Sequence, residues 1–261
     1  MFELERFQAE LQTRQWGRSV HYLPRCASTN DIARRDAEVG RPQGHLVLTD
    51  DQYEGRGRFR RSWISVPGKG LTFSLLVRSW PADRISLLPL ALGIATARCL
   101  GAHSCPATLK WPNDVRVRGK KIAGILCETT WHHPDQPATT IAGIGINVNE
   151  NREEYPVALR SVVTSVRMVL GRPVSREALL ARLLLEIESI LDTGSNPDWD
   201  RLRKDWISFC DHVDAKVQID NGQERISGYF TGIDGTGSAR LQTANGERTV
   251  SSGILRVVKR L

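Results

Sequence analysis

The chain has 261 residues, with 36 Lys and Arg against 29 Asp and Glu, which gives a formal net charge of +7. A hydrophobic fraction of 40% and a charged fraction of 25% are close to those of an average globular protein, and they exclude a disordered, collagen-like or coiled-coil chain. No apolar run approaches the roughly 20 residues of a membrane helix. The first residues, MFELERFQAE, are too acidic and polar for a signal or transit peptide. The excess positive charge favours an anionic partner, which at this point is a nucleic acid, a nucleotide or a membrane surface.

The cysteines and histidines give no sign of a cross-linked or metal-bound framework. The five cysteines are odd in number, scattered and without a CxxC pair. Six histidines lie at no metal-ligand spacing: His21, His45, His103, His132, His133 and His212. We therefore expect a reduced, cytoplasmic protein. A Ser-His-Asp arrangement and a GxxxxGK[ST] phosphate loop are also missing from the sequence.

The first part of the chain alternates predicted helices and strands. A helical lead-in is expected over 1–19, and Ser28 or Thr29 is a good N-cap for a helix that runs to about Glu38. Strands are expected at 20–23, 45–50 and 71–79. Residues 52–70 carry four glycines and four arginines without a helical or strand period, and they predict a long loop.

A buried helix, a group of strands and three more helices follow. Residues 86–101 predict a buried helix despite Pro89. Strands are expected at 107–117, 118–131 and 139–149. Gly119 supplies the turn between the first two of these strands, and the polar residues 132–137 form the tip between the last two. Helices are expected at about 161–170, 175–192 and 197–209.

The sequence changes character after about Cys210. Short strands are expected at 214–220, 224–234, 238–244, 248–253 and 254–259, separated by the turn-like NG, DGTG and NG. We therefore predict two domains, an α/β or α+β domain over 1–210 and a small all-β barrel over 211–261.

The segment 55–63, GRGRFRRSW, has the composition of an anion-binding loop. Glycines let a backbone approach a ligand closely, and arginines present planar forks that match carboxylate and phosphate groups. Trp63 adds a flat face on which a purine can stack. We expect the loop to become ordered when its ligand arrives. The alternative is a solvated basic loop or an RNA-binding arginine patch.

A second motif, KWPND at 110–114, is followed by KIAGIL at 121–126. Asn113 and Asp114 are polar side chains suited to a ribose, a phosphate or a metal ion. An ammonium group at Lys121 would neutralise charge that develops on a reacting carboxylate or phosphate. In isolation Lys120 and Lys121 fit an ordinary charged hairpin. For Lys120 we keep that interpretation.

Two further patterns are ambiguous when taken singly. In GIGINVN, at 143–149, glycine weakens a strand unless another group approaches closely, and Asn147 is suited to an adenine or ribose contact. The alternative is close packing between strands. The segment Ser28-Thr29-Asn30 offers donors and acceptors to a neutral polar group such as a urea, and otherwise simply caps a helix.

Taken together and in this order, the motifs resemble those of the biotin protein ligases. The matching residues are Ser28-Thr29-Asn30, Gln52 before GRGR, Trp63 after it, KWPNDV at 110–115, KIAGI at 121–125 and GIGINVN at 143–149. The resemblance covers about 20–150 by motif, and the β-rich tail is similar to the SH3-like domain of that family. It implies an α+β fold, with a mixed-sheet catalytic domain of the biotin/lipoate ligase type followed by a small SH3-like β-barrel.

This resemblance implies a two-step reaction with ATP and biotin as substrates and Mg²⁺ as cofactor. The biotin carboxylate attacks the α-phosphate of ATP to give biotinyl-5′-AMP and pyrophosphate. A lysine of a biotin carboxyl carrier domain, part of a biotin-dependent carboxylase, then attacks the mixed anhydride and releases AMP. The alternatives are a lipoate or octanoate ligase or transferase of related fold and a nucleic-acid-binding module without enzymatic activity, which the charge of +7 prompts.

The resemblance also assigns roles to individual residues. Lys121 and Arg58 are the expected catalytic residues, and Lys121 bridges the biotin carboxylate and the α-phosphate. Biotin contacts are assigned to Ser28, Thr29, Asn30, Gln52, Arg56, Gly57, Arg58 and Lys121. ATP contacts are assigned to Arg56, Arg58, Arg61, Trp63, Asn113, Asp114, Lys121 and Asn147. Asp114 is also the candidate metal ligand.

Two features distinguish this sequence within that resemblance. The family loop usually reads GRGRxGRxW, with glycine where Arg60 stands here. If this position has a positive φ, arginine costs about 1 kcal/mol or more. Only 27 residues precede Ser28, whereas a helix-turn-helix domain needs about 60. We therefore expect a monofunctional ligase, a monomer or homodimer, with neither a DNA-binding nor a membrane-binding role.

Overall fold

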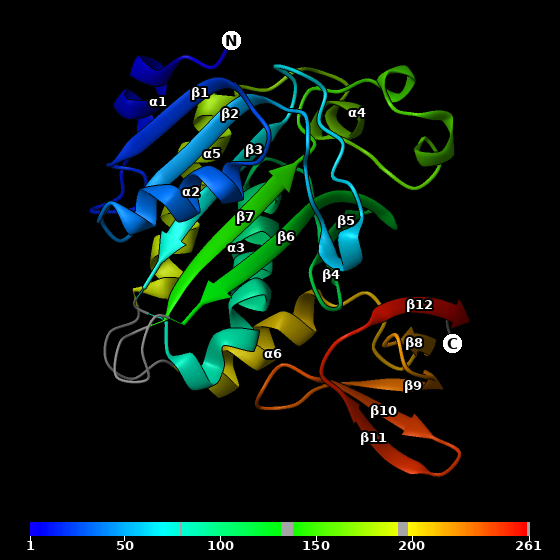
Figure 1. Cartoon of the computed structure of the whole chain (residues 1–261). Coiled ribbons are helices and arrows are strands. Elements are labelled where there is room, and N and C mark those ends of the chain that lie inside the picture. Colours follow the sequence, from blue (N-terminus) through cyan, green and yellow to red (C-terminus); the bar gives the residue numbers. More distant parts are fainter. Residues whose placement is uncertain (79, 132–137, 193–197, 260–261) are drawn as a thin grey trace.

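The computed structural model describes residues 1–78, 80–131, 138–192 and 198–259 (Figure 1). Its larger sheet has seven strands in the order β1-β2-β3-β7-β6-β5-β4. These strands are β1 (Val20–Cys26), β2 (Leu46–Gln52), β3 (Leu71–Val77), β4 (Thr108–Lys110), β5 (Asp114–Val117), β6 (Lys120–Thr130) and β7 (Thr139–Ile146). The helix α2 (Thr29–Glu38) connects β1 to β2, which pair in parallel, while the other neighbours pair antiparallel. The predicted mixed sheet is thereby confirmed.

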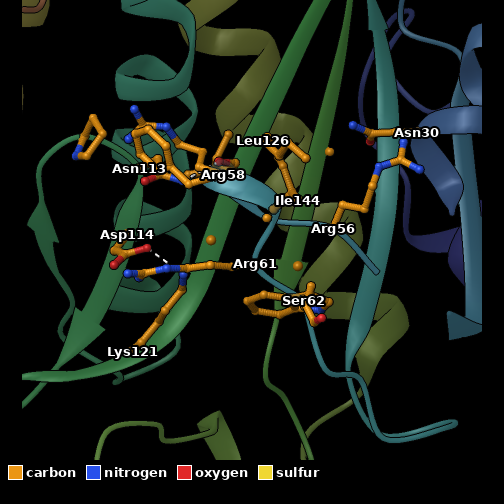
Figure 2. Close-up of a pocket in the computed structure, with 18 of the residues that line it drawn as sticks. Asn30, Arg56, Arg58, Arg61, Ser62, Asn113, Asp114, Lys121, Leu126 and Ile144 are labelled. Atoms are coloured by element: carbon orange, nitrogen blue, oxygen red, sulfur yellow. Dashed lines mark hydrogen bonds and ion pairs between the residues drawn. The ribbon is translucent and has the colours of Figure 1, made fainter. Parts of the chain in front are cut away.

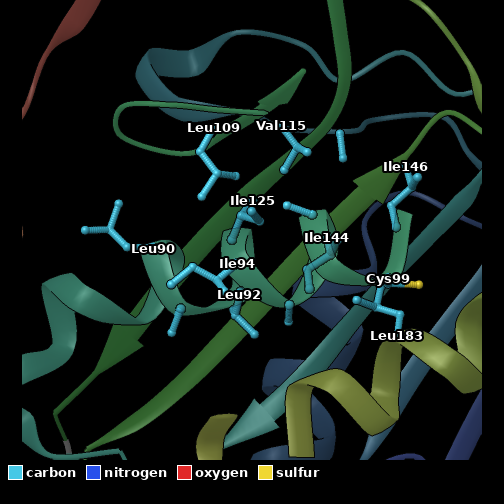
Figure 3. Packing of buried hydrophobic residues seen from close by; sticks show 14 of the residues in the cluster. Leu90, Leu92, Ile94, Cys99, Leu109, Val115, Ile125, Ile144, Ile146 and Leu183 are labelled. Atoms are coloured by element: carbon cyan, nitrogen blue, oxygen red, sulfur yellow. The ribbon is translucent and has the colours of Figure 1, made fainter. Parts of the chain in front are cut away.

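The two faces of this sheet have different roles. The helix α2 packs on β2, β3 and β7, whereas α3 (Leu88–Ala102) and α5 (Arg176–Leu191) lie together on the opposite face. Side chains alternate along a strand, so Ile144 and Ile146 of β7 join the main core together with Leu92 and Ile94 of α3 (Figure 3). Gly143 and Gly145 therefore point to the face that carries α2.

The predicted buried helix corresponds to α3. Pro89 is accommodated because it lies in the first turn, where its missing N–H would have no intrahelical acceptor. The expectation that no apolar run approaches the length of a membrane helix is wrong for one described segment, Ala82–Ala102, which is long and apolar enough to cross a membrane. However, 67% of its apolar window is buried inside the fold. Its side chains pack against α5 and the sheet, as expected for a core helix.

Three predicted elements differ from the observed ones by more than a few residues at their ends. The lead-in over 1–19 contains only the short helix α1 (Leu4–Glu10), and the helix expected at 161–170 is reduced to α4 (Val166–Leu170) because Ser165 caps its start. The strand expected at 107–117 is two strands, β4 and β5. Pro112 lacks the N–H that a continuous ladder needs, and the chain turns there. The tip predicted at 132–137 lies outside the described residues.

The C-terminal part forms a second, antiparallel sheet of SH3-like type, in the order β11-β10-β9-β8-β12. Its strands are β8 (Lys216–Asp220), β9 (Arg225–Ile233), β10 (Ala239–Thr243), β11 (Gly246–Val250) and β12 (Ile254–Lys259). The helix α6 (Trp199–Phe209) precedes it and packs against both α3 and β9. One hydrophobic cluster runs through both sheets, and the boundary between residues 210 and 211 stays a prediction.

Candidate functional site

A cavity opens on the face of the larger sheet that carries α2 (Figure 2). Its walls come from the start of α2, the loop after β2, the β4–β5 turn, β6, β7 and the residues just before and at the start of β12. The predicted residues that line it are Ser28, Thr29, Asn30, Gln52, Arg56, Gly57, Arg58, Arg61, Trp63, Asn113, Asp114 and Lys121. The fold therefore gathers the motifs into one place, with the exception of Asn147.

One corner of the cavity is neutral and densely hydrogen-bonded. Thr29 donates from its backbone N–H and its hydroxyl to Oε1 of Gln52, at 2.8 and 3.1 Å. Ser74 of β3 donates its hydroxyl toward Thr29 Oγ1 and Asn30 Oδ1, at 2.8 and 2.6 Å. Ser28 occupies the N-cap position, yet its side chain makes no capping hydrogen bond with α2, all of whose residues are described. The Ser28 hydroxyl is thus left to the cavity rather than to the helix.

Two glycines of β7 permit close approach by site residues. A Cβ atom on Gly143 would collide with the amide of Asn30, and one on Gly145 would collide with the indole ring of Trp63. Gly124, opposite Gly145 on β6, leaves room for Trp63 and for the end of the Lys121 side chain. The unusual glycines in these strands therefore fit the packing of site side chains against the sheet.

The arginine-rich loop is anchored at both ends of the cavity. Arg56 makes a bidentate ion pair with Asp31 of α2, with N–O distances of 2.7 and 2.6 Å, and its hydrogen bonds lower the pKa of Asp31. Arg58 donates to the hydroxyl of Ser252 at 2.7 Å, and its guanidinium lies 4.9 Å from the ring centroid of Phe59. Burial lowers the pKa of Arg58, which remains protonated as a poorly solvated cation.

The departure at Arg60 falls on a strained backbone position. Arg60 has φ of 57° and the preceding Phe59 has φ of 55°, both in the left-handed region. A non-glycine residue costs roughly 1–2 kcal/mol there. The conditional prediction from the family loop is therefore met, because the position that usually holds glycine does have a positive φ. The strain lies within the short 3₁₀ turn η1 (Arg58–Arg60).

Lys121 and Asp114 form a charged pair on adjacent strands. Nζ of Lys121 lies 2.6 Å from Oδ1 of Asp114 and 5.7 Å from the ring centroid of Trp63. Figure 2 shows Asp114, Lys121 and Arg61 grouped on one side of the cavity, with Asn30 and Arg56 on the other. Asp114 supplies the carboxylate of the lining, the ligand type that Mg²⁺ prefers. Asn113 has its amide N–H engaged with the carbonyl of Ile125 at 2.7 Å.

The lining is strongly cationic and includes a lysine that sequence reasoning missed. Its cations, all described, are Arg56, Arg58, Arg61, Lys110 and Lys121. Lys110 is poorly solvated, and burial, assisted by the charge of Arg116, lowers its pKa to about 8. Five cations around one carboxylate favour binding of an anion in the cavity. Lys110 is the first residue of the KWPND motif, but that motif assigned it no role, because its burial beside the cavity depends on tertiary contacts.

Asn147 is the predicted residue that the structure places elsewhere. It lies just beyond β7, is 4% exposed, and donates its amide to the carbonyl of Thr164 at 2.9 Å. Because Asn147 is not among the cavity-lining residues, its assignment to adenine stays a prediction.

Sequence reasoning also missed residues that act through partners far away in the chain. Ser74 is a buried hydroxyl in a predicted strand, and only its pairing with Thr29 and Asn30 reveals its role. Ser252 lies in the connection between β11 and β12, far along the chain, so no local pattern links it to Arg58. The contribution of Ser74 and Ser252 to the site therefore depends on tertiary contacts, which the sequence alone does not show.

Comparison with known proteins gives a consistent result. The model of the biotin/lipoate A/B protein ligase family matches residues 22–149. The chain is 30% identical to the bifunctional ligase/repressor BirA of Bacillus spizizenii, over 93% of this chain and 75% of the relative. It is 30% identical to the biotin–[acetyl-CoA-carboxylase] ligase of Paracoccus denitrificans, over 87% of this chain and 96% of the relative. A biotin protein ligase from Aquifex aeolicus, solved in complex with biotin and ATP, has a TM-score of 0.79, with 28% identity over 92% of this chain and 99% of that one.

Proposed function

The chain belongs to the biotin/lipoate A/B protein ligase family, and we propose that it acts as a biotin–[biotin carboxyl-carrier protein] ligase. The observation that carries this proposal is the arrangement of the cavity. A neutral corner at the start of α2 and a cationic side around Lys121 line the same space. Biotin has matching chemistry, since it joins a neutral ureido ring to a carboxylate.

The first step joins two anions, and the cationic side is suited to bring them together. An oxygen of the biotin carboxylate forms a bond to the α-phosphorus of ATP, and the bond from that phosphorus to the β-phosphate bridging oxygen breaks. Pyrophosphate leaves with the electron pair of that bond. Lys121, Arg58 and Arg61 offset the charge that accumulates on the non-bridging oxygens, and Lys121 exchanges its pairing with Asp114 for the reacting groups.

The neutral corner explains the choice of substrate. Hydroxyl and amide groups of Ser28, Asn30 and Gln52 offer donors and acceptors to the N–H and C=O groups of a urea. The dithiolane ring of lipoate has no such groups and would leave these polar side chains unmatched, which costs binding energy. We therefore favour biotin over the lipoate or octanoate alternative.

The second step transfers biotin to a protein. The amine of a lysine on a biotin carboxyl carrier domain attacks the acyl carbon of biotinyl-5′-AMP, and AMP leaves. Mg²⁺ would accompany ATP and offset phosphate charge, with Asp114 as the carboxylate available to hold it. We further propose a cytoplasmic location. The absence of a DNA-binding or membrane-binding role and a monomeric or homodimeric state stay predictions.

Formation of the acyl-adenylate tests the proposed first step. The purified chain is incubated with Mg·ATP and either biotin or lipoate, and acid-quenched products are identified by mass spectrometry. The expected result is biotinyl-5′-AMP with an equal amount of pyrophosphate, and little lipoyl-AMP. Lipoyl-AMP without biotinyl-AMP would establish the lipoate alternative instead. If neither adenylate forms and DNA binds tightly with a steep salt dependence, the nucleic-acid-binding alternative is supported.

A further inference from the structure

A cluster of two histidines and one aspartate lies at the C-terminal end of α2, whereas residues at the start of α2 line the cavity. His21 is in β1, Asp36 is in the last turn of α2, and His45 immediately precedes β2. Oδ2 of Asp36 lies 2.8 Å from Nδ1 of His21 and 2.9 Å from Nε2 of His45. The three ligand-type atoms all lie within 4.8 Å of one another. Three segments of the chain thus direct nitrogen and oxygen atoms toward one point.

The surroundings of His45 prepare its Nε2 atom to bind a cation. His45 is only 1% exposed, and its Nδ1 atom lies 2.7 Å from the hydroxyl of Ser19. When Ser19 accepts a hydrogen bond from Nδ1–H, the lone pair of Nε2 is directed toward Asp36. An outer hydrogen bond of this kind fixes the tautomer and ring orientation of histidines that bind metals.

The cluster also has access and suitable dimensions. The side chain of His21 is 40% exposed, so an ion can enter from that side and retain water ligands. Bonds of about 2.0–2.1 Å from zinc to nitrogen or oxygen place tetrahedral ligand atoms roughly 3.3 Å apart. The distances from Asp36 Oδ2 to His21 Nδ1 and His45 Nε2, 2.8 and 2.9 Å, are therefore about half an ångström too short. Rotation of the Asp36 and His21 side chains can lengthen them by this amount.

We propose that His21, Asp36 and His45 form a binding site for a divalent first-row transition-metal ion. Two imidazole nitrogens and one carboxylate oxygen are a donor set that suits Zn²⁺ and its neighbours rather than Mg²⁺ or Ca²⁺. The bound ion would join β1, the end of α2 and the start of β2. The site is separate from the catalytic cavity, which lies at the opposite end of α2.

Metal titration of the full-length, untagged chain tests this proposal. The protein is dialysed against a chelator and then against chelator-free buffer without ATP or biotin. Zn²⁺ binding is followed by calorimetry and Co²⁺ binding by visible absorption. The expected result is one equivalent bound, with a rise in the melting temperature that depends on metal concentration. This readout does not require ligase activity, so it succeeds or fails separately from the proposed function.

Three substitutions identify the site. His21→Ala removes a half-exposed ligand and is expected to weaken the affinity for Zn²⁺ more than tenfold. Ser19→Ala removes the outer partner of His45 and is expected to weaken that affinity roughly 10–100-fold. His103→Ala is the matched control, because His103 pairs with the carbonyl of Cys99 outside this cluster. The proposal is overturned if the wild-type chain shows no saturable binding, or if His21→Ala binds Zn²⁺ as tightly as the wild-type chain does.

Discussion

Lys121 is the residue on which the proposed chemistry depends most. Its ammonium group lies 2.6 Å from Asp114 at the edge of the cavity. Removing one preorganised group that stabilises developing charge typically costs about 10²–10³-fold in rate. We predict a loss of that size in the rate of biotinyl-5′-AMP formation for Lys121→Ala, measured by pyrophosphate release.

The neighbouring Lys120 provides a matched control for this substitution. It carries the same charge on the same strand, but it is not among the cavity-lining residues. Lys120→Ala is therefore expected to change the rate less than twofold. Equal losses in the two variants would mean that overall charge, rather than the position of Lys121, supports the reaction.

Glu150 is a buried carboxyl group whose titration affects stability. It is 1% exposed, its Oε2 atom has no hydrogen-bond partner among the described residues, and burial raises its pKa from 4.5 to about 7. The folded chain therefore binds this proton more tightly than the unfolded chain does. The contribution of Glu150 to stability is present below about pH 4.5 and is lost as pH rises through about 7.

We predict that Glu150→Gln stabilises the chain at pH 8 relative to the wild type. The gain is on the order of 1–3 kcal/mol and is smaller at pH 5, as measured by urea unfolding at both values. Glu154→Gln is the control, because hydrogen bonding from the Asn151 N–H lowers the pKa of Glu154, which gives a pH dependence of opposite sign. A Glu150→Gln difference that does not change with pH would contradict this assignment.

At the scale of elements, strand β7 shows how far the sequence predicts the site. Its alternating glycines left two interpretations open, a group that approaches the strand closely or close packing between strands, and the structure shows the first. The pattern did not identify that group as Trp63, since the ring comes from a loop whose position depends on tertiary contacts. For the same reason the sequence predicted α2 and the N-cap position of Ser28, but neither the missing capping hydrogen bond of Ser28 nor the use of Ser74 beside it.

A double-mutant cycle tests the packing between β7 and the loop. Gly145→Ala places a methyl group where the Trp63 ring lies, so we expect the KM for ATP to rise about tenfold or more. In a Trp63→Ala background the same change has nothing to displace, and its additional effect is expected to be small. Additive effects of the two substitutions would show that Gly145 acts independently of Trp63.

At the scale of the whole molecule, the two sheets are joined by the loop between β9 and β10. Trp111 donates from Nε1 to the carbonyl of Gly237 at 3.0 Å, and Ser86 donates to the carbonyl of Thr236 at 2.5 Å. A Cβ atom on Gly237 would lie 2.9 Å from side-chain atoms of Leu87 and Leu90. Both sheets could be predicted from local turn residues and from the alternation of apolar and polar residues along the strands. The sequence could not predict their docking, which depends on residues distant in the chain.

We predict that Gly237→Ala weakens this docking and lowers the free energy of unfolding of the whole chain in one transition. Overpacking at a contact of this kind costs about 1–3 kcal/mol. Gly222→Ala is the matched control, since Gly222 also has a positive φ but no atom lies within 4 Å of its Cβ position. If both variants are destabilised equally in thermal unfolding, the loss comes from backbone strain and not from docking.

The complete reaction is tested by labelling of an acceptor protein. A biotin carboxyl carrier domain is incubated with the chain, Mg·ATP and biotin, and its intact mass is measured. The predicted result is the addition of one biotinyl group per carrier. This addition depends on ATP and is absent when the acceptor lysine is replaced by arginine. A carrier that stays unmodified with biotin, or that is modified only when lipoate replaces biotin, would contradict the proposed function.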